Sequence, residues 1–557
     1  MQADTLDKLL VHWARETPDT VWLKDLLPEG SRDITWGEAA ATVNAMAAML
    51  EHHFGHGQRI SLLSRNCAHW FLADLAIISS GNVTVSMFTT LPAATAQYIM
   101  DFTETRVLIV GETTNWQAVR QVLPEGTTLI TLPGVELEEP HLRWEALLAE
   151  WQGKAPAYRC QPDDVISLVF TSGTTGLPKG VIQTHRSNLV PITRFRTAFG
   201  TRDNARYFSY LPLSHIAERQ IVEFSSLTCC GEVSFNQNLE TLAADLQRTR
   251  PHMFFGPPRV WEQLKQAVVA KFGGNEALEQ ALAQDAEGIG RLILEGLGLD
   301  QVEYCLVAAA PTPPALIEWW QRLGLILMEG FGQTEAMGVI ASGHDSRRIG
   351  SIGKPIGEVE FRITEEGELA VRADGCTPGY YNQPDKTEEL IRDGWLHTGD
   401  KARVDEDGFV YLTGRVKDYF KTIQGKFVAP PPIEGEFAKN PHTEQHCLLG
   451  RGFSKTVMVA VLNEAARQLA AASREQAEAE IAQAIHQAVQ SINEAVEKHA
   501  RIGAVILSRE EWTIDNEVLT PTLKIRREKV EERYGELAEG LARSAAEQSE
   551  VLLHWAE

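Results

Sequence analysis

Short runs of apolar, often β-branched residues alternate with stretches of helix-forming residues along the first two-thirds of the chain. The clearest runs cover residues 59–63, 83–87, 106–110 and 165–170, and segments such as 36–51 and 93–102 carry helix formers between them. This alternation predicts parallel α/β layers. It resumes between residues 206 and 330, where strands are expected at 232–235, 252–255, 304–308 and 325–328.

The pattern changes after about residue 350. Short apolar runs separated by glycine and acidic turns fill residues 352–413 and predict antiparallel, β-barrel-like structure. A boundary is expected near 414–418, where a charged segment follows a glycine. Beyond it, Ile481, Ile485, Val489, Ile492 and Val496 recur every three or four residues and predict an amphipathic helix over 475–499. The expected fold class is α/β, with a large N-terminal domain over 1–416 and a small α+β domain over 417–557.

Composition narrows the class of protein. The chain has 557 residues, of which 44% are hydrophobic and 23% charged, as in a globular protein with several cores. Its formal net charge of −23 argues against a nucleic-acid binder or a general binder of anionic membranes. There is no run of about 18 apolar residues and no secretory signal at the start. The seven cysteines are scattered without CxxC spacing, which predicts reduced thiols in a cytoplasmic protein and gives no zinc or iron–sulfur pattern.

The most informative segment is 169–181, VFTSGTTGLPKGV. Its glycines allow backbone N–H groups to approach an oxyanion, and its hydroxyls and final lysine add donors and a cation. The loop differs from the Walker type, because a proline precedes its lysine and a glycine follows it. A polar surface loop is the alternative, but the order of the residues favours nucleotide phosphate. The residues predicted to bind it are Thr171, Ser172, Gly173, Thr174, Thr175, Gly176 and Lys179.

The string TSGTTGLPKG resembles the signature loop of the superfamily that contains acyl-CoA synthetases, firefly luciferase and nonribosomal-peptide adenylation domains. Further segments match this family in the same order along the chain. They are EGFGQTE at 329–335, DGWLHTGD at 393–400, GRVKDYFK at 414–421 and LTPTLKIRR at 519–527. The resemblance extends over nearly the whole chain and implies a small C-terminal domain hinged to the large one.

In the first of these segments the resemblance implies contacts with the nucleotide and its metal. Phe331 would stack on adenine, Thr334 would contact the α-phosphate and Glu335 would hold Mg²⁺. Glu329 and Gly332 belong to the same nucleotide-binding segment. Read alone, this string is equally consistent with a polar strand end.

The later segments imply contacts with the ribose and a hinge. Asp400 and Arg415 would bind the ribose, although Asp400 alone could simply cap a turn. Lys417 would mark the hinge and Lys421 would approach the site in the thioester-forming orientation, the alternative for both being solvated charges. Lys524 would be the catalytic lysine, offsetting negative charge in the transition state.

Finer features look like the long-chain branch of the family. They are YLPLSHIAER at 210–219, MFFGPPRVWE at 253–262 and the final run from 498 to 527. His215 would line the carboxylate side of the acid pocket and Trp261 would border the acyl channel, core packing being the alternative for both. Two departures stand out: Ala308, Ala309 and Ala310 occupy positions where relatives commonly keep glycine, and three prolines at 430–432 stiffen a segment near the hinge.

The resemblance therefore implies ATP-dependent activation of a fatty acid to acyl-AMP, followed by transfer to coenzyme A, with Mg²⁺ as cofactor. Three alternatives stay open: a ligase that delivers acyl-AMP to a carrier protein, a coenzyme A ligase for a non-fatty acid, and a non-catalytic nucleotide or lipid sensor. The implied partners are the acid, ATP and coenzyme A, and no nucleic acid. Peripheral membrane contact and a homodimer are further expectations for this cytoplasmic protein.

Overall fold

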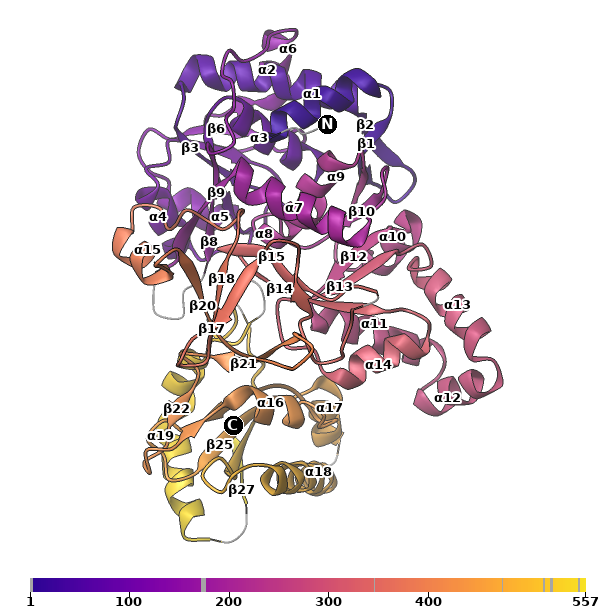
Figure 1. The fold of residues 1–557 in the computed structure, drawn as a ribbon, viewed down its shortest axis with the longest axis vertical. Coiled ribbons are helices and arrows are strands. Elements are labelled where there is room, and N and C mark those ends of the chain that lie inside the picture. The colour runs from indigo at the N-terminus through magenta and orange to yellow at the C-terminus, as the bar shows by residue number, and fades with distance from the viewer. Residues whose placement is uncertain are drawn as a thin grey trace. The chain divides into compact units, whose positions relative to one another are not determined.

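The computed structural model describes residues 4–171, 177–344, 346–472, 474–513, 516–520, 524–548 and 551–556. Its described residues form two compact units (Figure 1). Unit 1 comprises residues 1–362, 370–397 and 406–410, and unit 2 comprises 363–369, 398–405 and 411–557. Each unit is built around its own sheets.

One sheet of unit 1 has the strand order β7-β6-β5-β3-β4-β8-β9 and is parallel except for its last pair, β8 and β9. Its strands are β3 (Arg59–Leu63), β4 (Val83–Met87), β5 (Val107–Val110), β6 (Thr128–Thr131), β7 (Leu142–Arg143), β8 (Val165–Thr171) and β9 (Lys179–Thr184). The helices that accompany it are α1 (Leu6–Glu16), α2 (Trp36–Phe54), α3 (Ala68–Ser79), α4 (Ala93–Phe102), α5 (Trp116–Val119), the short η1 (Arg120–Val122) and α6 (Trp144–Trp151).

Successive residues of these strands pack into different cores, because side chains alternate between the two faces of a strand. In β5, Val107 and Ile109 join the core that contains α2, α3 and α6, whereas Leu108 and Val110 join the core that contains α4. Both faces of the sheet are therefore covered by helices. This explains why a strand such as β5 is a continuous apolar run in the sequence.

Two further sheets complete the core of unit 1. The order β10-β11-β1-β2 joins β1 (Val21–Leu26), β2 (Ser31–Thr35), β10 (Arg206–Ser209) and β11 (Glu232–Phe235). The order β12-β13-β14-β15-β16 joins β12 (Met253–Gly256), β13 (Tyr304–Val307), β14 (Leu327–Gln333), β15 (Ala336–Ala341) and β16 (Lys354–Pro355). Helices of this region are α7 (His185–Phe199), α8 (Ile216–Glu218), the π-helical η2 (Arg219–Phe224), α9 (Ser225–Thr228), α10 (Leu242–Thr249), α11 (Pro258–Lys271), α12 (Asn275–Gln284), α13 (Ala286–Leu297) and α14 (Pro314–Arg322).

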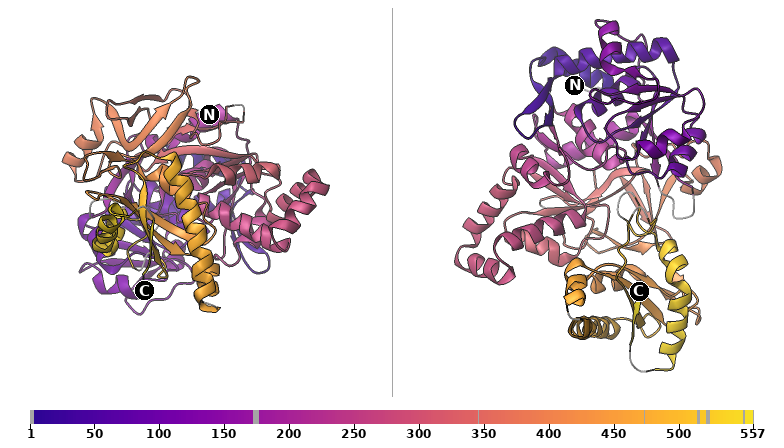
Figure 2. Two further views of the ribbon diagram at one scale, coloured as in Figure 1. Left: turned by 90° about the horizontal axis from the view of Figure 1, so that it is seen from below. Right: turned by 180° about the vertical axis from the view of Figure 1, so that it is seen from behind.

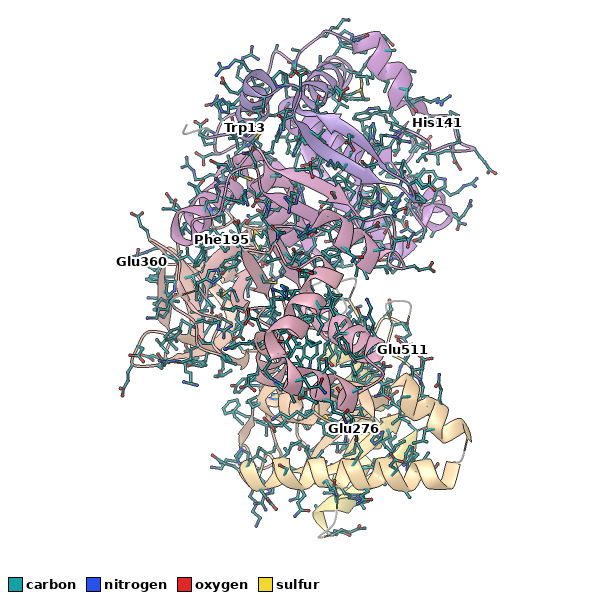
Figure 3. All side chains as sticks on the ribbon, turned by 90° about the vertical axis from the view of Figure 1, so that its right-hand side faces the viewer. Trp13, His141, Phe195, Glu276, Glu360 and Glu511 are labelled. Carbon is teal, nitrogen blue, oxygen red and sulfur yellow. The ribbon has the colours of Figure 1, made fainter. Side chains whose placement is uncertain are left out.

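Aromatic side chains connect these layers inside unit 1. Trp13 of α1 donates its Nε1–H to the carbonyl of Leu227 at 2.6 Å. Phe195 of α7, which like Trp13 is labelled in Figure 3, packs edge-on against Tyr304 of β13, with ring centroids 4.9 Å apart. Both contacts join segments that are more than 100 residues apart, so they fix the layers against one another.

The strands after residue 360 contribute residues to both units. They are β17 (Glu360–Ile363), β18 (Glu368–Arg372), β19 (Ile391–Arg392), β20 (Trp395–Val404) and β21 (Val410–Arg415), with α15 (Pro384–Leu390) before β19. The β19–β20 pair is antiparallel. This agrees with the antiparallel structure predicted for the region.

The main sheet of unit 2 has the order β24-β25-β26-β27, formed by β24 (Thr443–Leu449), β25 (Thr456–Leu462), β26 (Ile502–Ser508) and β27 (Leu552–Ala556). A small hairpin, β22 (Phe420–Lys421) and β23 (Phe427–Val428), precedes it. One face of the main sheet carries α16 (Pro430–Phe437), α17 (Glu464–Ala472) and α18 (Arg474–Ala495), and the other carries α19 (Arg527–Ala546) (Figure 1 and Figure 2). The unit is thus an α+β sandwich.

The sequence analysis predicted most of these elements. β3, β4, β11 and α4 have the expected bounds, and α18 buries Ile481, Ile485, Val489 and Ile492 on one face. The three prolines at 430–432 form the first turn of α16, where a missing N–H costs no helical hydrogen bond. All seven cysteines are free thiols. Among the described helices, none is both long enough and apolar enough to cross a membrane.

Candidate functional site

The predicted phosphate loop joins two antiparallel strands of unit 1. Thr171 ends β8 and lies opposite Lys179, the first residue of β9. Ser172, Gly173, Thr174, Thr175 and Gly176 lie outside the described residues. The hairpin nevertheless fixes both ends of the loop, so the Lys179 side chain begins at a defined position.

Lys179 and Glu335 are connected through one tyrosine. The ammonium of Lys179 lies 4.6 Å from the centroid of the Tyr380 ring, a cation–π distance. The hydroxyl of Tyr380 donates to Oε1 of Glu335 at 2.7 Å. Two predicted site residues from segments 156 positions apart therefore meet at a third residue that the sequence analysis did not name.

The segment 329–335 occupies β14 and the turn that follows it. Phe331 and Thr334 are buried, and Gly332 lies so close to β15 that an added Cβ would stand 3.1 Å from the amide nitrogen of Gly338. The carbonyl of Thr334 accepts a hydrogen bond from the side-chain amide of Gln183 at 2.7 Å. The end of β14 is therefore tied to β9, the strand that begins with Lys179.

Glu329 lies deeper in the same strand. It is buried, and its Oε2 accepts the backbone N–H of Gly350 at 2.9 Å. Burial raises the pKa of Glu329 to about 7, because the charged form loses hydration. Its bonding to Gly350 places it as a support for the strand behind the predicted nucleotide contacts.

In unit 2 the two predicted ribose ligands form an ion pair. Asp400 is buried in β20, and its Oδ1 lies 3.2 Å from Nε of Arg415, at the end of β21. The Asp400 amide is bonded to the hydroxyl of Thr398 at 3.1 Å, and the Val416 amide donates to the carbonyl of Gly399 at 2.8 Å. The structure thus brings together two residues that the motifs had indicated separately.

The three predicted lysines of unit 2 are exposed. Lys417 follows β21, and Lys421 lies over the ring of Phe427 at 4.7 Å in the β22–β23 hairpin. Lys524 lies in a tight turn, where its amide donates to the Thr520 hydroxyl at 3.0 Å and its carbonyl accepts the Thr520 amide at 2.8 Å. These reciprocal bonds fix the backbone from which the long Lys524 side chain extends.

The residues predicted for the acid pocket lie in different surroundings. His215 caps α8, its Nδ1 accepting the amide of Ala217 at 3.2 Å. Trp261 is fully buried in α11, donates to the carbonyl of Gly256 at 3.0 Å and packs edge-on against Phe254 and Trp320. Trp261 therefore belongs to the core beneath β12, and its role at an acyl channel stays a prediction.

The alanines 308–310 follow the end of β13. Ala308 is half-buried and packs against an apolar cluster that includes Phe255 and Met328, while Ala309 and Ala310 are exposed. Ala309 has φ of 74°, a left-handed conformation that a Cβ disfavours. Glycine adopts this conformation without that cost.

Another group of polar side chains has the composition of a metal centre. Ligand atoms of Asp7, Cys160 and His185 lie within 4.8 Å of one another, and His185 and Cys160 are buried. However, Nδ1 of His185 accepts the Leu6 amide at 3.1 Å, so in the neutral ring Nε2 carries the proton and offers no lone pair. Metal-bound histidines normally donate from their second nitrogen. The group therefore does not fit a metal ion.

The residues around Glu335 fit a magnesium–nucleotide complex better. Oε1 of Glu335 is bonded to Tyr380, and for the second carboxylate oxygen the described residues provide no hydrogen-bond partner. Mg²⁺ prefers carboxylate and phosphate oxygens, and a lysine nearby suits the negative charge of a polyphosphate. The donor set thus matches the group that the motifs implied.

Comparison with known proteins identifies the family. The model of the AMP-binding enzyme family matches residues 10–381, about two-thirds of the chain. The chain belongs to this AMP-binding enzyme family. The model of the family's C-terminal domain matches residues 417–544.

Individual relatives agree with this assignment. A long-chain-fatty-acid–CoA ligase, ACSBG2, of Xenopus laevis is 30% identical over 441 residues, which is 69% of this chain and 58% of the relative. The aligned part of the chain thus spans little more than half of that relative. The fatty acyl-CoA synthetase A of Dictyostelium discoideum is 27% identical, with 92% of this chain and 86% of the relative covered.

A solved structure shares the fold of this AMP-binding enzyme. The adenylation domain of a carboxylate reductase from Mycobacterium chelonae superposes with a TM-score of 0.82 at 21% identity, covering 97% of this chain and 91% of that one. The predicted α/β fold, with a large N-terminal and a small C-terminal part, is confirmed.

Tyr380 is the residue that sequence reasoning missed. It lies in TPGYYNQP, between the recognised strings, and a glycine–proline-rich stretch of this kind reads as a turn. The pair of aromatic residues inside that turn could have indicated Tyr380, because large aromatic side chains usually pack against other residues.

Proposed function

We propose that this chain is an AMP-forming acid–thiol ligase that activates a long-chain fatty acid with ATP and transfers it to coenzyme A. The observation that carries the proposal is the link from Lys179 through Tyr380 to Glu335 in a chain of the AMP-binding family. The names of the relatives from Xenopus laevis and Dictyostelium discoideum support a fatty acid as the substrate and coenzyme A as the acceptor.

In the first half-reaction a carboxylate oxygen of the acid bonds to the α-phosphorus of ATP, and the bond from that phosphorus to pyrophosphate breaks. No general base is needed, because the acid is already ionised at neutral pH. Lys179 and the donors of the 171–176 loop would hold the phosphates. Glu335 and Thr334 would hold Mg²⁺ and the α-phosphate, and the metal supplies charge neutralisation on the leaving group.

Further predicted residues would bind the nucleoside. Phe331 would stack on adenine, and Asp400, kept in place by Arg415, would accept hydrogen bonds from the ribose hydroxyls. Lys524 would stabilise the negative charge that grows on the α-phosphate in the transition state.

In the second half-reaction the sulfur of coenzyme A bonds to the acyl carbon, the bond from that carbon to the phosphate oxygen breaks, AMP leaves, and the thiol proton is released to water. The proposed change between the halves is a pivot of the small domain, 417–557, about Lys417, which brings Lys421 in place of Lys524. A long acyl chain would contribute strongly to binding, since each buried methylene gives about 0.8 kcal/mol. His215 and Ala308 would line the carboxylate end of this pocket.

The proposal is tested by pyrophosphate release with fatty acids of increasing length, with coenzyme A or a phosphopantetheinylated carrier protein as acceptor. Thioester formation with coenzyme A alone is the expected result. Product on the carrier protein only would favour the carrier-directed ligase, and release with short or aromatic acids only would reassign the substrate. Absence of release with every acid would favour a non-catalytic sensor.

A variant separates the two half-reactions. Lys524→Ala is expected to lose at least a hundredfold in acyl-AMP formation but to convert supplied acyl-AMP to thioester normally. Lys498→Ala, another exposed lysine of unit 2, is the matched control and should leave both rates unchanged. Normal acyl-AMP formation by Lys524→Ala would show that the catalytic cation lies elsewhere.

We propose three further properties of the whole protein. Its free thiols suit the reducing cytoplasm. A water-insoluble substrate suits peripheral contact with membranes, which co-sedimentation with phosphatidylcholine vesicles would measure. A homodimer remains an expectation that sedimentation equilibrium would test.

A further inference from the structure

The segment 377–381 runs beside β9 as an additional, irregular strand. The Ile182 amide donates to the carbonyl of Gly379 at 3.0 Å, and the Tyr381 amide donates to the carbonyl of Gly180 at 2.8 Å. Tyr380 itself forms an antiparallel bridge with Val181. The segment is thus attached to the strand that begins with Lys179.

The same segment is attached to the end of β14. The Thr377 amide donates to the carbonyl of Glu335 at 2.8 Å, and the Tyr380 hydroxyl donates to the carboxylate of Glu335 at 2.7 Å. The backbone and the side chain of Glu335 are therefore both held by one short segment. This fixes the direction in which the carboxylate points.

The position of Tyr380 is itself tightly set. Its amide donates to the hydroxyl of Thr387 at 2.9 Å, and the ring is largely buried. The preceding Gly379 has φ of 143°, and a Cβ at that position would lie 2.4 Å from Cγ2 of Thr387. Only glycine allows the segment to approach α15 this closely, so Tyr380 has little freedom to move.

One side chain therefore contacts two oppositely charged groups in different ways. The Lys179 ammonium lies over the face of the ring, and the Glu335 carboxylate accepts from the hydroxyl at its edge. A magnesium–polyphosphate needs a cation for its phosphates and a carboxylate for its metal, both at fixed positions. Tyr380 meets the geometric requirement for both.

We infer that Tyr380 is a positioning residue that holds Glu335 for the metal and Lys179 for the phosphates of a magnesium–nucleotide complex. The inference rests on the proposed function and deepens it. Tyr380 makes its two contacts with different parts of its side chain. The hydroxyl positions Glu335 for the metal, and the ring positions Lys179 for the phosphates.

The test measures nucleotide binding by titration calorimetry, with ATP plus Mg²⁺ and with ATP plus EDTA. Tyr380→Phe removes only the hydroxyl, so it should weaken Mg–ATP binding about tenfold, as expected for a lost hydrogen bond to a charged group, and leave metal-free ATP binding unchanged. Tyr380→Leu also removes the ring and should weaken both. Tyr381→Phe, next in the chain, is the matched control and should change neither.

Two further readouts distinguish positioning from a structural defect. The magnesium concentration for half-maximal pyrophosphate release should rise about tenfold in Tyr380→Phe, with kcat recovered at saturating magnesium. Its thermal unfolding should match that of the wild type. Equal losses with and without metal, or unchanged binding in Tyr380→Phe, would overturn the inference.

The experiment also separates this inference from the proposed function. If wild-type protein binds Mg–ATP but releases no pyrophosphate with any acid, the proposed reaction is wrong while the binding comparison still tests Tyr380. If wild-type protein does not bind Mg–ATP at all, both are wrong.

Discussion

Two charged assemblies in unit 1 differ in what surrounds them. Around Arg219, the carboxylates of Asp74 and Glu223 lie at 2.5 and 3.4 Å and the hydroxyl of Ser167 at 2.5 Å, and the three charged side chains are fully buried. Around Tyr380, Lys179 and Glu335 are only partly buried. The first assembly is shielded from solvent, and its charged groups pair with one another. The second keeps charge within reach of a ligand.

Burial shifts the pKa of one carboxyl group in the Arg219 assembly. Burial raises the pKa of Glu223 well above its usual range, and the neighbouring Asp74 raises it further. The Arg219 guanidinium opposes both effects on the pKa of Glu223, because its positive charge favours the ionised carboxylate. The buried ion pairs join η2 to α3 and specify how these elements pack, whereas the partly exposed assembly around Tyr380 is suited to binding.

The largest expected effect comes from removing the cation of the buried Arg219 assembly. Arg219→Met should lower the free energy of unfolding by about 3–5 kcal/mol, because it leaves buried carboxyl groups without their cation. Urea denaturation followed by circular dichroism measures this loss. Arg186→Met, which breaks the exposed pair with Asp163, is the matched control and should change stability by less than about 1 kcal/mol. Similar values for the two variants would contradict the distinction.

His185 offers a third case, a buried titratable group whose ring accepts the Leu6 amide and lies near Asp7. Burial lowers its pKa to about 4 from the usual 6.5. The unfolded chain then binds a proton between pH 6.5 and 4 that the folded chain does not, so stability falls as the pH falls through this window. The loss attributable to His185 should reach about 3 kcal/mol at pH 4.

His185→Gln tests this contribution, since glutamine keeps an acceptor for the Leu6 amide but does not titrate. Urea denaturation at pH 7 and pH 4 should show a smaller acid loss in the variant than in the wild type. His53→Gln, at an exposed histidine of α2, should retain the full loss. An unchanged acid loss in His185→Gln would place the titrating group elsewhere.

The contrast between the two assemblies also explains what sequence could predict. Strands such as β5 are continuous apolar runs because helices cover both of their faces, and that pattern is local. The predicted contacts of Glu335, Asp400 and Lys179 came from short ordered strings. Each string could be recognised from its own residues, without knowledge of distant contacts.

What sequence did not predict depends on distant contacts. Arg219 lies beside Asp74 across 145 positions, and Tyr380 reaches Glu335 across 45, with no periodicity to connect them. For Trp261 the sequence left two alternatives, because an aromatic side chain suits the wall of an acyl channel as well as a hydrophobic core. Its packing against Phe254 and Trp320 shows the surroundings of a core.

The third prediction tests the partly exposed assembly around Tyr380. Glu335→Gln keeps an oxygen for the Tyr380 hydroxyl, so its free energy of unfolding should change by less than about 1 kcal/mol. Loss of the charge should weaken Mg–ATP binding by about a hundredfold, or roughly 2.7 kcal/mol, measured by calorimetry. Glu358→Gln, at an exposed carboxylate of unit 1, is the control for charge alone. A large loss in the free energy of unfolding of Glu335→Gln would show that Glu335 stabilises the fold, as Asp74 does.

The smallest expected effect concerns backbone strain beside the site. Ala309 is held at φ of 74°, where a Cβ costs about 1–2 kcal/mol, and glycine would remove that strain at an entropic cost of about 0.5–1 kcal/mol. Ala309→Gly should therefore raise the free energy of unfolding by about 0.5–1 kcal/mol. Ala308→Gly, one residue earlier and outside the left-handed region, should lower it by at least a similar amount, because the entropic cost applies without relief of strain and the half-buried methyl loses its contacts. If both variants lose stability, the alanine at 309 is unstrained, and its departure from glycine must be explained by contacts of its methyl group.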